Sequence, residues 1–432
     1  MRRGQSLFPG HTLSNEGNPL SNDAEAHSHE GCSVVKGRAG SACAAAVLAV
    51  VVAAAGCSSG GDDDGGKGGG GGQKAAAKLA ITPATGTKQV APDQPVTVKA
   101  DKGKLTEVTV ADAKGRKAEG ALAPDGLSWK SRWTLRPSTT YTVTAKGTDD
   151  GKTVTATSTF TTLTPRKKLE SGMAPLDGEK VGVGMPVQLL LTQPVSTKAG
   201  RAAVERSLEV RMSKPVEGAW HWISDKEVDF RPREYWPTGS KVQVVAHLAG
   251  VKAGNGLYGV KDRTLNFSVG AKHYTKINAK THRATVKDGD KTVRTMKVSL
   301  GKPGDDSYTG VMIAQEKVAH MVMDSSTTGN PGDYRTPTDW NVRTTYSGTF
   351  VHSAPWSTGS QGSANVSHGC VNASPTDAKW FYDFTQRGDI IEVTGTTRKL
   401  RFGNGPTPWA ISWDGWLKGS ALGAPVMGQP LK

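Results

Sequence analysis

Beyond its N-terminal region, the chain is dominated by short runs in which apolar and polar residues alternate. Val96 and Val98 alternate with polar residues in "PVTVKA", as do Tyr141 and Val143 in "TYTVTA". A period of two places successive side chains on opposite faces of a β-strand, so that one face can be buried. Turn residues separate these runs, and we therefore predict a β-sandwich over residues 79–164.

The next hundred residues repeat this plan. The run "PVTVKA" is echoed by "PVQLLL" from Pro186, and "LRPSTTYTVTA" is echoed by "FRPREYWPTGSKVQVVA" from Phe230. The repeat predicts a second module of the same immunoglobulin-like (Ig-like) architecture over residues 165–270. Neither module contains a cluster of titratable residues, and His221, between two tryptophans, is interpreted as core. We therefore expect both modules to act as spacers.

Strand patterns continue over residues 271–396, but with different motifs. The segment "ATVKDGDKTVRTMKVSLG" predicts a hairpin that turns at Asp288 and Gly289. Two further strands are predicted in "GVMIAQEKVAHMVMDSS", another in "YSGTFVHSA", and a last one in "DIIEVTG". This region is therefore expected to be a separate β-rich domain.

One main helix is predicted in this third domain, directly after "SHGCVNAS". Ser374 is a typical N-cap, Pro375 suits the first turn, and Gly388 ends the pattern. Its apolar face consists of Ala378, Phe381 and Phe384. The remaining residues, 397–432, contain Trp409, Trp413 and Trp416. We expect this C-terminal extension to form a Trp-rich flap packed onto the third domain, which completes a mainly β fold class.

The N-terminus has the features of an export signal. Two basic residues precede an apolar run over residues 42–55, which is shorter than the roughly 20 residues that a membrane-spanning helix needs. The run ends in "AAAGCSSGG", which resembles the lipobox of bacterial lipoproteins and implies that Cys57 is acylated. The alternative is an ordinary signal peptide cleaved nearby. We expect a signal region over residues 1–57 and a flexible Gly-rich linker over residues 58–78.

Charge and cysteine content narrow the possible functions. The formal net charge of +15 favours anionic surroundings such as nucleic acid, acidic lipid or a cell wall, and export argues against nucleic acid. Of the 4 cysteines, Cys32 and Cys43 lie in the signal region and Cys57 is expected to carry lipid. Cys370 therefore has no disulfide partner in the exported chain.

Cys370 and His352 are the candidate catalytic pair. His352 lies near the end of a predicted strand, and Cys370 lies just before the predicted helix. A strand end and a helix entry can meet in space, which would let imidazole remove the thiol proton for attack on a carbonyl. Gly369, which lacks a Cβ, is expected to aim two successive N–H groups at the resulting oxyanion.

Two simpler interpretations of these residues remain open at this point. A lone cysteine is often a small buried apolar residue, although an unpaired thiol is unusual in an exported protein. A zinc site from His352, His368 and Cys370 would lack a fourth ligand, and His-x-Cys is not a usual chelate spacing. No metal or other cofactor is therefore expected.

Longer motifs around these residues resemble the L,D-transpeptidases, of the actinobacterial lipoprotein type with two Ig-like modules. The resemblance rests on "MDSST", "GDYRT", "YSGTFVHSAPWS" and "SHGCVNASPTDAKWFYDFTQRGDIIEV", and it covers most of residues 273–396. It implies a peptidoglycan crosslinking enzyme that is acylated by a tetrapeptide donor stem. The acyl group then passes to the side-chain amine of a diamino acid in another stem, which forms a 3→3 crosslink.

The resemblance also implies roles for individual residues. Cys370 would be the nucleophile, His352 the base and acid, and the backbone carbonyl of Ser353 would orient the imidazole. The donor and oxyanion site would be lined by Tyr334, Ser347, Gly348, His368, Gly369 and Asn372. Carbapenem β-lactams would inhibit by acylating the same cysteine.

Two alternative functions compete with crosslinking. The same site would be an L,D-carboxypeptidase if water were the acceptor, and a wall-binding lipoprotein would need no reactive site. The expected location is the outer face of the cell membrane, with a lipid anchor at Cys57 and the domains reaching into the wall.

Overall fold

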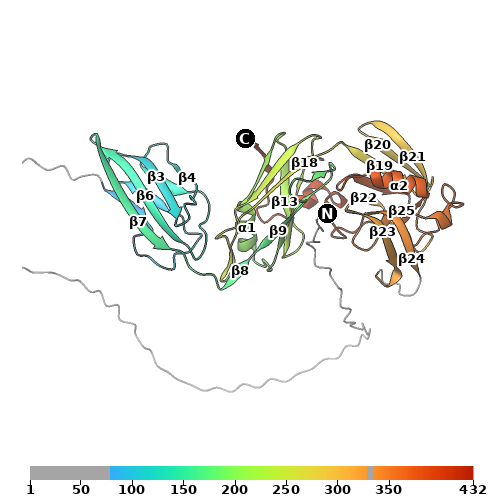
Figure 1. Ribbon diagram of the computed structural model, residues 1–432, viewed down its shortest axis with the longest axis horizontal. Helices are drawn as coiled ribbons and strands as arrows, with labels where there is room; N and C mark the ends of the chain where they lie inside the picture. Colours follow the sequence, from blue (N-terminus) through green and yellow to red (C-terminus); the bar gives the residue numbers. More distant parts are fainter. Residues whose placement is uncertain (1–77, 328–333, 432) are drawn as a thin grey trace, which may run out of the picture. The chain divides into compact units, whose positions relative to one another are not determined.

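The computed structural model describes residues 78–327 and 334–431, and β-strands predominate in it (Figure 1). The expected signal region and Cys57 lie outside the described residues. No helix within the described ranges is both long enough and apolar enough to span a membrane.

The first sandwich has a four-stranded sheet in the order β1-β2-β5-β4 and a three-stranded sheet in the order β3-β6-β7. Its core contains Val96, Val98, Tyr141 and Val143, which are the residues of the alternating pattern. The strands are β1 (Leu79–Thr82), β2 (Thr97–Ala100), β3 (Lys104–Asp112), β4 (Gly120–Leu122), β5 (Ser128–Ser131), β6 (Thr140–Asp149) and β7 (Lys152–Thr161).

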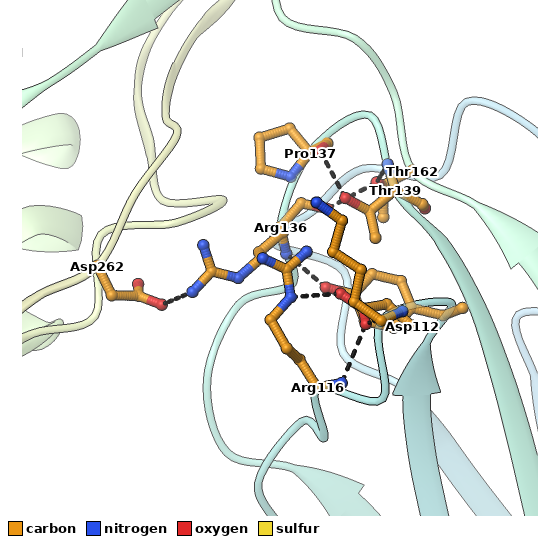
Figure 2. A network of polar contacts seen from close by, with 9 residues as sticks. Asp112, Arg116, Arg136, Pro137, Thr139, Thr162 and Asp262 are labelled. Atoms are coloured by element: carbon orange, nitrogen blue, oxygen red, sulfur yellow. Dashed lines mark hydrogen bonds and ion pairs between the residues drawn. The ribbon is translucent and has the colours of Figure 1, made fainter.

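A network of polar contacts lies at one end of this sandwich (Figure 2). Arg116 Nε donates to Asp112 Oδ2 at 2.7 Å, and Thr162 Oγ1 donates to the Arg136 carbonyl at 2.7 Å. Arg136 Nη2 reaches Asp262 of the second sandwich at 2.8 Å. Both members of this last pair are about one-third exposed, and such pairs contribute only about 0–1 kcal/mol.

The second sandwich is built from two five-stranded sheets, and it also contains a helix and a small three-stranded sheet. The helix was not predicted from the sequence. His221 is buried in this sandwich, as expected. The elements are β8 (Lys167–Leu169), β9 (Ser171–Ala174), β10 (Lys180–Val181), β11 (Val187–Leu191), α1 (Lys198–Arg206), β12 (Leu208–Met212), β13 (Glu217–Trp222), β14 (Glu227–Pro232), β15 (Lys241–Ala246), β16 (Lys252–Gly254), β17 (Leu257–Gly259) and β18 (Arg263–Val269).

The third domain contains a nine-stranded sheet in the order β22-β27-β19-β20-β21-β26-β25-β24-β23. The predicted hairpin at Asp288 and Gly289 is confirmed as the turn between β20 and β21. The elements are β19 (His273–Asn278), β20 (Arg283–Asp288), β21 (Lys291–Ser299), β22 (Gly310–Ile313), β23 (Glu316–Asp324), η1 (Ser325–Thr327), β24 (Arg335–Arg343), β25 (Phe350–Ser353), η2 (Pro355–Ser357), β26 (Val371–Ala373), α2 (Pro375–Phe384) and β27 (Ile390–Thr394).

Helix α2 forms where the sequence predicts it. Ser374 is the N-cap, and its hydroxyl accepts a hydrogen bond from the Asp377 N–H at 3.1 Å. Ala378 and Phe381 of α2 are buried and share a core with Val351 of β25 and Val371 of β26. The helix therefore covers one face of the sheet (Figure 1).

The C-terminal extension does not fold as expected. Instead of packing only onto the third domain, it returns to the second sandwich, where β28 pairs with β13 and β29 pairs with β12. Trp416 is fully buried there, and its indole N–H donates to Ala219 O at 2.9 Å. The elements of the extension are η3 (Pro408–Ala410), α3 (Trp413–Leu417), β28 (Val426–Met427) and β29 (Gln429–Pro430).

Tryptophans of the extension pack against this sandwich. The guanidinium of Arg231 lies 4.5 Å from the ring centre of Trp409, and it also lies over the rings of Trp413 and Trp416. The pattern of tryptophans correctly indicates that the extension packs against something. It does not identify the partner, because the contacts join residues about two hundred positions apart.

We predict that Trp416→Ala destabilises the second sandwich by about 3–5 kcal/mol, since it removes a fully buried aromatic side chain. Urea unfolding followed by circular dichroism measures the effect. Trp356→Ala is the matched control, because that tryptophan is 57% exposed and its loss should change stability by less than about 0.5 kcal/mol. Equal shifts in the two variants would contradict the packing described for the extension.

Candidate active site

Two neighbouring parallel strands organise the candidate site. Strand β25 pairs with β26 so that His352 lies opposite Asn372 and Val351 lies opposite Val371. Val351 and Val371 point into the core under α2. Because side chains alternate along a strand, His352, Cys370 and Asn372 lie on the other face of the sheet. The register thus brings together the two candidate catalytic residues, which are separated by 18 positions in sequence.

The orientation of the His352 ring is set by a backbone hydrogen bond. Nδ1 lies 2.8 Å from the carbonyl oxygen of Ser353, and a carbonyl can only accept. Nδ1 therefore carries the hydrogen, and the lone pair is on Nε2, which is the arrangement that a general base needs. His352 is 3% exposed, and this burial lowers its pKa to about 4, although the bond to Ser353 opposes the shift.

The Cys370 thiol lies in an environment that favours its neutral form. Its Sγ donates to the carbonyl oxygen of Gly348 at 3.7 Å. Burial of the sulfur raises the pKa of Cys370 to about 11, although the Phe350 backbone and the charge of Arg343 act in the opposite direction. The resting pair is therefore a thiol and a neutral imidazole rather than a thiolate and an imidazolium.

Asn372 is held on the same face by the loop that follows β25. Its Nδ2 donates to Ser357 Oγ at 3.0 Å, and Ser357 in turn donates to Ala354 O at 3.2 Å. Gln361 Nε2 donates to the same carbonyl at 3.0 Å. The Asn372 side chain is therefore fixed beside His352 by contacts with a buried loop.

The expectation that Gly369 aims two successive N–H groups at an oxyanion stays a prediction, and the N–H of Gly369 itself has a partner within the chain. The Gly369 N–H donates to Ser367 Oγ at 3.1 Å, and that hydroxyl donates to Cys370 O at 2.7 Å. The hydroxyl thus closes a small turn in front of the nucleophile candidate. A glycine suits this position because the Gly369 φ of +116° is rarely adopted by residues with a Cβ.

The rings of His368 and Tyr334 lie close to each other. Their ring centres are 5.1 Å apart. Lys302 Nζ lies 3.0 Å from His368 Nε2, and an ammonium group can only donate, so Nε2 is the acceptor in this contact. Nε2 of the exposed His368 ring thus contacts Lys302, whereas Nε2 of His352 carries a lone pair and no hydrogen.

Ser347 and Gly348 belong to the tight turn between β24 and β25. The Thr349 N–H donates to Thr345 Oγ1 at 3.0 Å, and Gly348 has a φ of +89°. The Gly348 carbonyl that accepts from Cys370 is presented by this turn. All six residues predicted for the donor and oxyanion site therefore lie in segments that flank Cys370 or His352, or in segments that contact these flanking segments. They are Tyr334, Ser347, Gly348, His368, Gly369 and Asn372.

Several residues around the site were not identified from the sequence. Ser367 and Ser357 fix the segments on either side of the candidate pair, and Lys302 binds His368. Ser367 lies within the motif that contains Cys370, so its position was a usable signal. Lys302 and the tail residue Asn404, which binds Ser347, lie far from the motif and give no local signal.

The arrangement sets a candidate nucleophile and a candidate base on one strand pair among fixed hydrogen-bonding groups, and acyl transfer requires parts of these kinds. No group of three or more His, Cys, Asp or Glu side chains within residues 78–327 and 334–431 has the geometry of a metal site.

Comparisons with known proteins identify two families along the chain. Residues 87–252 match the family described as bacterial Ig domain, and residues 272–393 match the L,D-transpeptidase catalytic domain. L,D-transpeptidase 2 of Mycobacterium tuberculosis is 38% identical over 80% of this chain and 85% of that protein. L,D-transpeptidase 5 of the same species is 33% identical over 81% of this chain and 78% of that protein.

A solved structure of an LD transpeptidase in complex with imipenem is 37% identical, and the match covers 53% of this chain and 100% of that one. Its TM-score of 0.46 is too low to carry a structural argument. Family membership rests instead on the match to the catalytic-domain family and on the relative that shares 38% identity over 85% of its length. The chain belongs to the L,D-transpeptidase family, with Ig-like structure preceding the catalytic domain.

Proposed function

We propose that this protein crosslinks peptidoglycan by a cysteine-dependent acyl transfer that forms 3→3 bridges. One observation carries the proposal: Cys370 and the lone pair of His352 share one face of the β25–β26 pair, and Ser353 fixes the imidazole tautomer. Membership of the L,D-transpeptidase family supports the same reaction class.

In the first step, His352 Nε2 removes the thiol proton as Cys370 Sγ attacks the carbonyl carbon of the third residue in the donor stem. The carbonyl becomes a tetrahedral oxyanion. When it collapses, the bond to the terminal D-alanine breaks and the imidazolium returns the proton to the leaving amine. The products are a thioester on Cys370 and free D-alanine, and His352 is neutral again.

In the second step, the side-chain amine of an acceptor stem attacks the thioester. His352 takes a proton from the amine and returns it to the sulfur as the thioester breaks. A new amide is formed without ATP, because the energy of the first amide is kept in the thioester. Water in place of the amine would make the enzyme an L,D-carboxypeptidase.

Burial explains why, in the proposed reaction, the thiol proton moves to His352 during the attack of sulfur on carbon and not before it. The pKa of His352 is lowered to about 4 and that of Cys370 is raised to about 11, both by burial. A preformed ion pair is therefore disfavoured, and the thiol ionises only as its sulfur begins to bond to carbon. This protects an unpaired thiol from oxidation between turnovers, because the thiolate is the reactive form.

We also propose that carbapenem β-lactams acylate Cys370. A β-lactam is a strained amide whose carbonyl would take the place of the donor carbonyl. The thioester that results is bulky and hinders the approach of an acceptor amine. Such compounds are therefore expected to inhibit by persistent acylation.

The proposed location is the outer face of the cell membrane, with Cys57 as the lipidated residue. We predict that Cys57→Ala releases the protein from the membrane fraction, because the acyl chains are its anchor. Cys43→Ala, in the same apolar segment, is the control and should leave the protein in that fraction. Retention of the Cys57→Ala variant on membranes after signal processing would contradict the anchor assignment.

The proposed reaction is tested by incubating the purified protein with a tetrapeptide stem and analysing the products by mass spectrometry. We predict a crosslinked dimer with loss of one D-alanine, formed faster than the tripeptide. Tripeptide as the main product would assign the site to hydrolysis. Unchanged stem would contradict both reactions and would favour a wall-binding role.

The pKa of His352 predicts the pH dependence of acylation. His352 is a base only when neutral, so the acylation rate should be level near neutral pH and fall as the pH drops through about 4. His352→Ala should be slower by about 100-fold at neutral pH, and its residual rate should rise with pH as the thiol ionises. Stopped-flow acylation by a carbapenem measures both profiles.

His320→Ala is the control for this prediction, because His320 is exposed and pairs with Asp339 away from the candidate pair. It should retain the wild-type profile. A wild-type midpoint between pH 6 and 7 would show that His352 is not desolvated as described. An unchanged rate in His352→Ala would move the base role to another residue.

A further inference from the structure

The turn that precedes β25 determines where the Gly348 carbonyl lies. This six-residue turn, residues 344–349, is closed by a hydrogen bond from the Thr344 N–H to Thr349 O at 2.9 Å. Its Gly348 carbonyl accepts the hydrogen bond from the Cys370 thiol at 3.7 Å. A displacement of the turn would therefore move a direct contact of the proposed nucleophile.

A side chain from the C-terminal extension holds this turn at two points. Asn404 Oδ1 accepts from the Ser347 N–H at 2.9 Å, and Asn404 Nδ2 donates to Ser347 Oγ at 2.9 Å. Ser347 Oγ also lies 3.2 Å from Thr345 Oγ1, which is the acceptor for the Thr349 N–H. The carboxamide thus donates to and accepts from one residue of the turn, Ser347. Through Thr345 the chain of hydrogen bonds reaches the Thr349 N–H on the other side of the turn.

The segment around Asn404 is itself fixed. The Gly403 N–H donates to Thr407 Oγ1 at 3.0 Å, and the Tyr346 N–H contacts the Asn404 carbonyl at 3.4 Å. Gly405 approaches Gln315 so closely that a Cβ there would lie 2.6 Å from Nε2 of that side chain. The same Nε2 donates to the Thr344 carbonyl at 2.6 Å. Asn404 therefore projects from a tightly packed loop rather than from a free tail.

The extension is anchored beyond Asn404 on the second sandwich. The indole N–H of Trp409 donates to the Gly184 carbonyl at 2.8 Å, and Trp416 is fully buried against β13. The two anchors on the second sandwich, Trp409 and Trp416, thus lie 5 and 12 positions beyond Asn404. The position of the turn beside Cys370 depends on a segment that the second sandwich holds in place.

We propose that Asn404 is a positioning residue for acylation, which acts through Ser347 to hold the Gly348 carbonyl and its turn beside Cys370. This inference rests on the proposed function for its kinetic consequence. A small displacement of a residue that positions reacting groups can lower a rate by up to about 100-fold. Because Asn404 acts through Ser347 and does not itself contact Cys370, we expect a smaller effect. Asn404→Ala should lower the acylation rate by about tenfold.

The test compares Asn404→Ala, Asn404→Asp and wild type in the full chain, with carbapenem acylation as the readout. Asn404→Asp keeps the acceptor for the Ser347 N–H but loses the donor to Ser347 Oγ, so its rate should lie between the other two. Asn255→Ala, an exposed asparagine of the second sandwich, is the matched control and should acylate at the wild-type rate. Urea unfolding midpoints should be the same for all four proteins.

A double-mutant cycle distinguishes positioning from general damage. If Asn404 acts through Ser347, then Asn404→Ala should add little to the loss already caused by Ser347→Ala. Full additivity of the two losses, or a wild-type rate in Asn404→Ala, would overturn the proposal. A lowered unfolding midpoint in Asn404→Ala that accounts for the loss would also overturn it, because the role would then be structural.

Alkylation of Cys370 by iodoacetamide separates this proposal from the proposed function. The reaction needs only the thiol and its surroundings, so it can be measured even if no acyl transfer occurs. Asn404→Ala should change the alkylation rate severalfold, because the contact of Sγ with the Gly348 carbonyl is loosened. An unchanged alkylation rate contradicts the positioning role, whereas a changed rate in a protein that forms no acyl product contradicts the proposed function alone.

Discussion

The parallel register between β25 and β26 is the constraint on which the rest of the candidate site depends. It sets His352 opposite Asn372 and places the residue before β26, Cys370, on the same face of the sheet. The opposite face of the two strands carries Val351 and Val371, which are buried under α2. A slip of one residue would exchange the faces and put the imidazole into the core, so packing against α2 fixes the chemistry on the other side.

The surroundings of this strand pair determine the protonation states. His352 and Cys370 are both desolvated, which disfavours each charged form, and the Ser353 carbonyl selects the tautomer with a free Nε2. Hydrogen bonds from Ser367, Ser357 and the turn at Ser347 hold the neighbouring segments. The site is thus a neutral pair held by fixed hydrogen bonds, and in the proposed reaction charge develops on it only when a carbonyl is attacked.

Sequence patterns predicted the parts of the fold that local signals encode. The N-cap at Ser374 and the apolar face of α2 lie within one segment, as does the turn at Asp288 and Gly289. Strand β26 was not predicted, because three residues are too few to show a period. The docking of the extension was predicted only in part: Asn404 contacts Ser347 of the third domain as expected. The pairing with the second sandwich was missed, since β28 and β29 are two residues each and pair with strands far away in sequence.

At the site, too, features encoded in one short segment could be predicted from the sequence, whereas contacts between distant segments could not. The Cys370 and His352 pair was predicted from residue type and motif, but the pKa values depend on burial by distant segments. The contact of Asn404 with Ser347 joins residues 57 positions apart. The most direct test of the account is to locate the acyl group after reaction with a carbapenem, by proteolysis and tandem mass spectrometry. The account predicts a single thioester on Cys370 and no adduct in Cys370→Ala. An adduct on any other residue, or one that persists in Cys370→Ala, would contradict it.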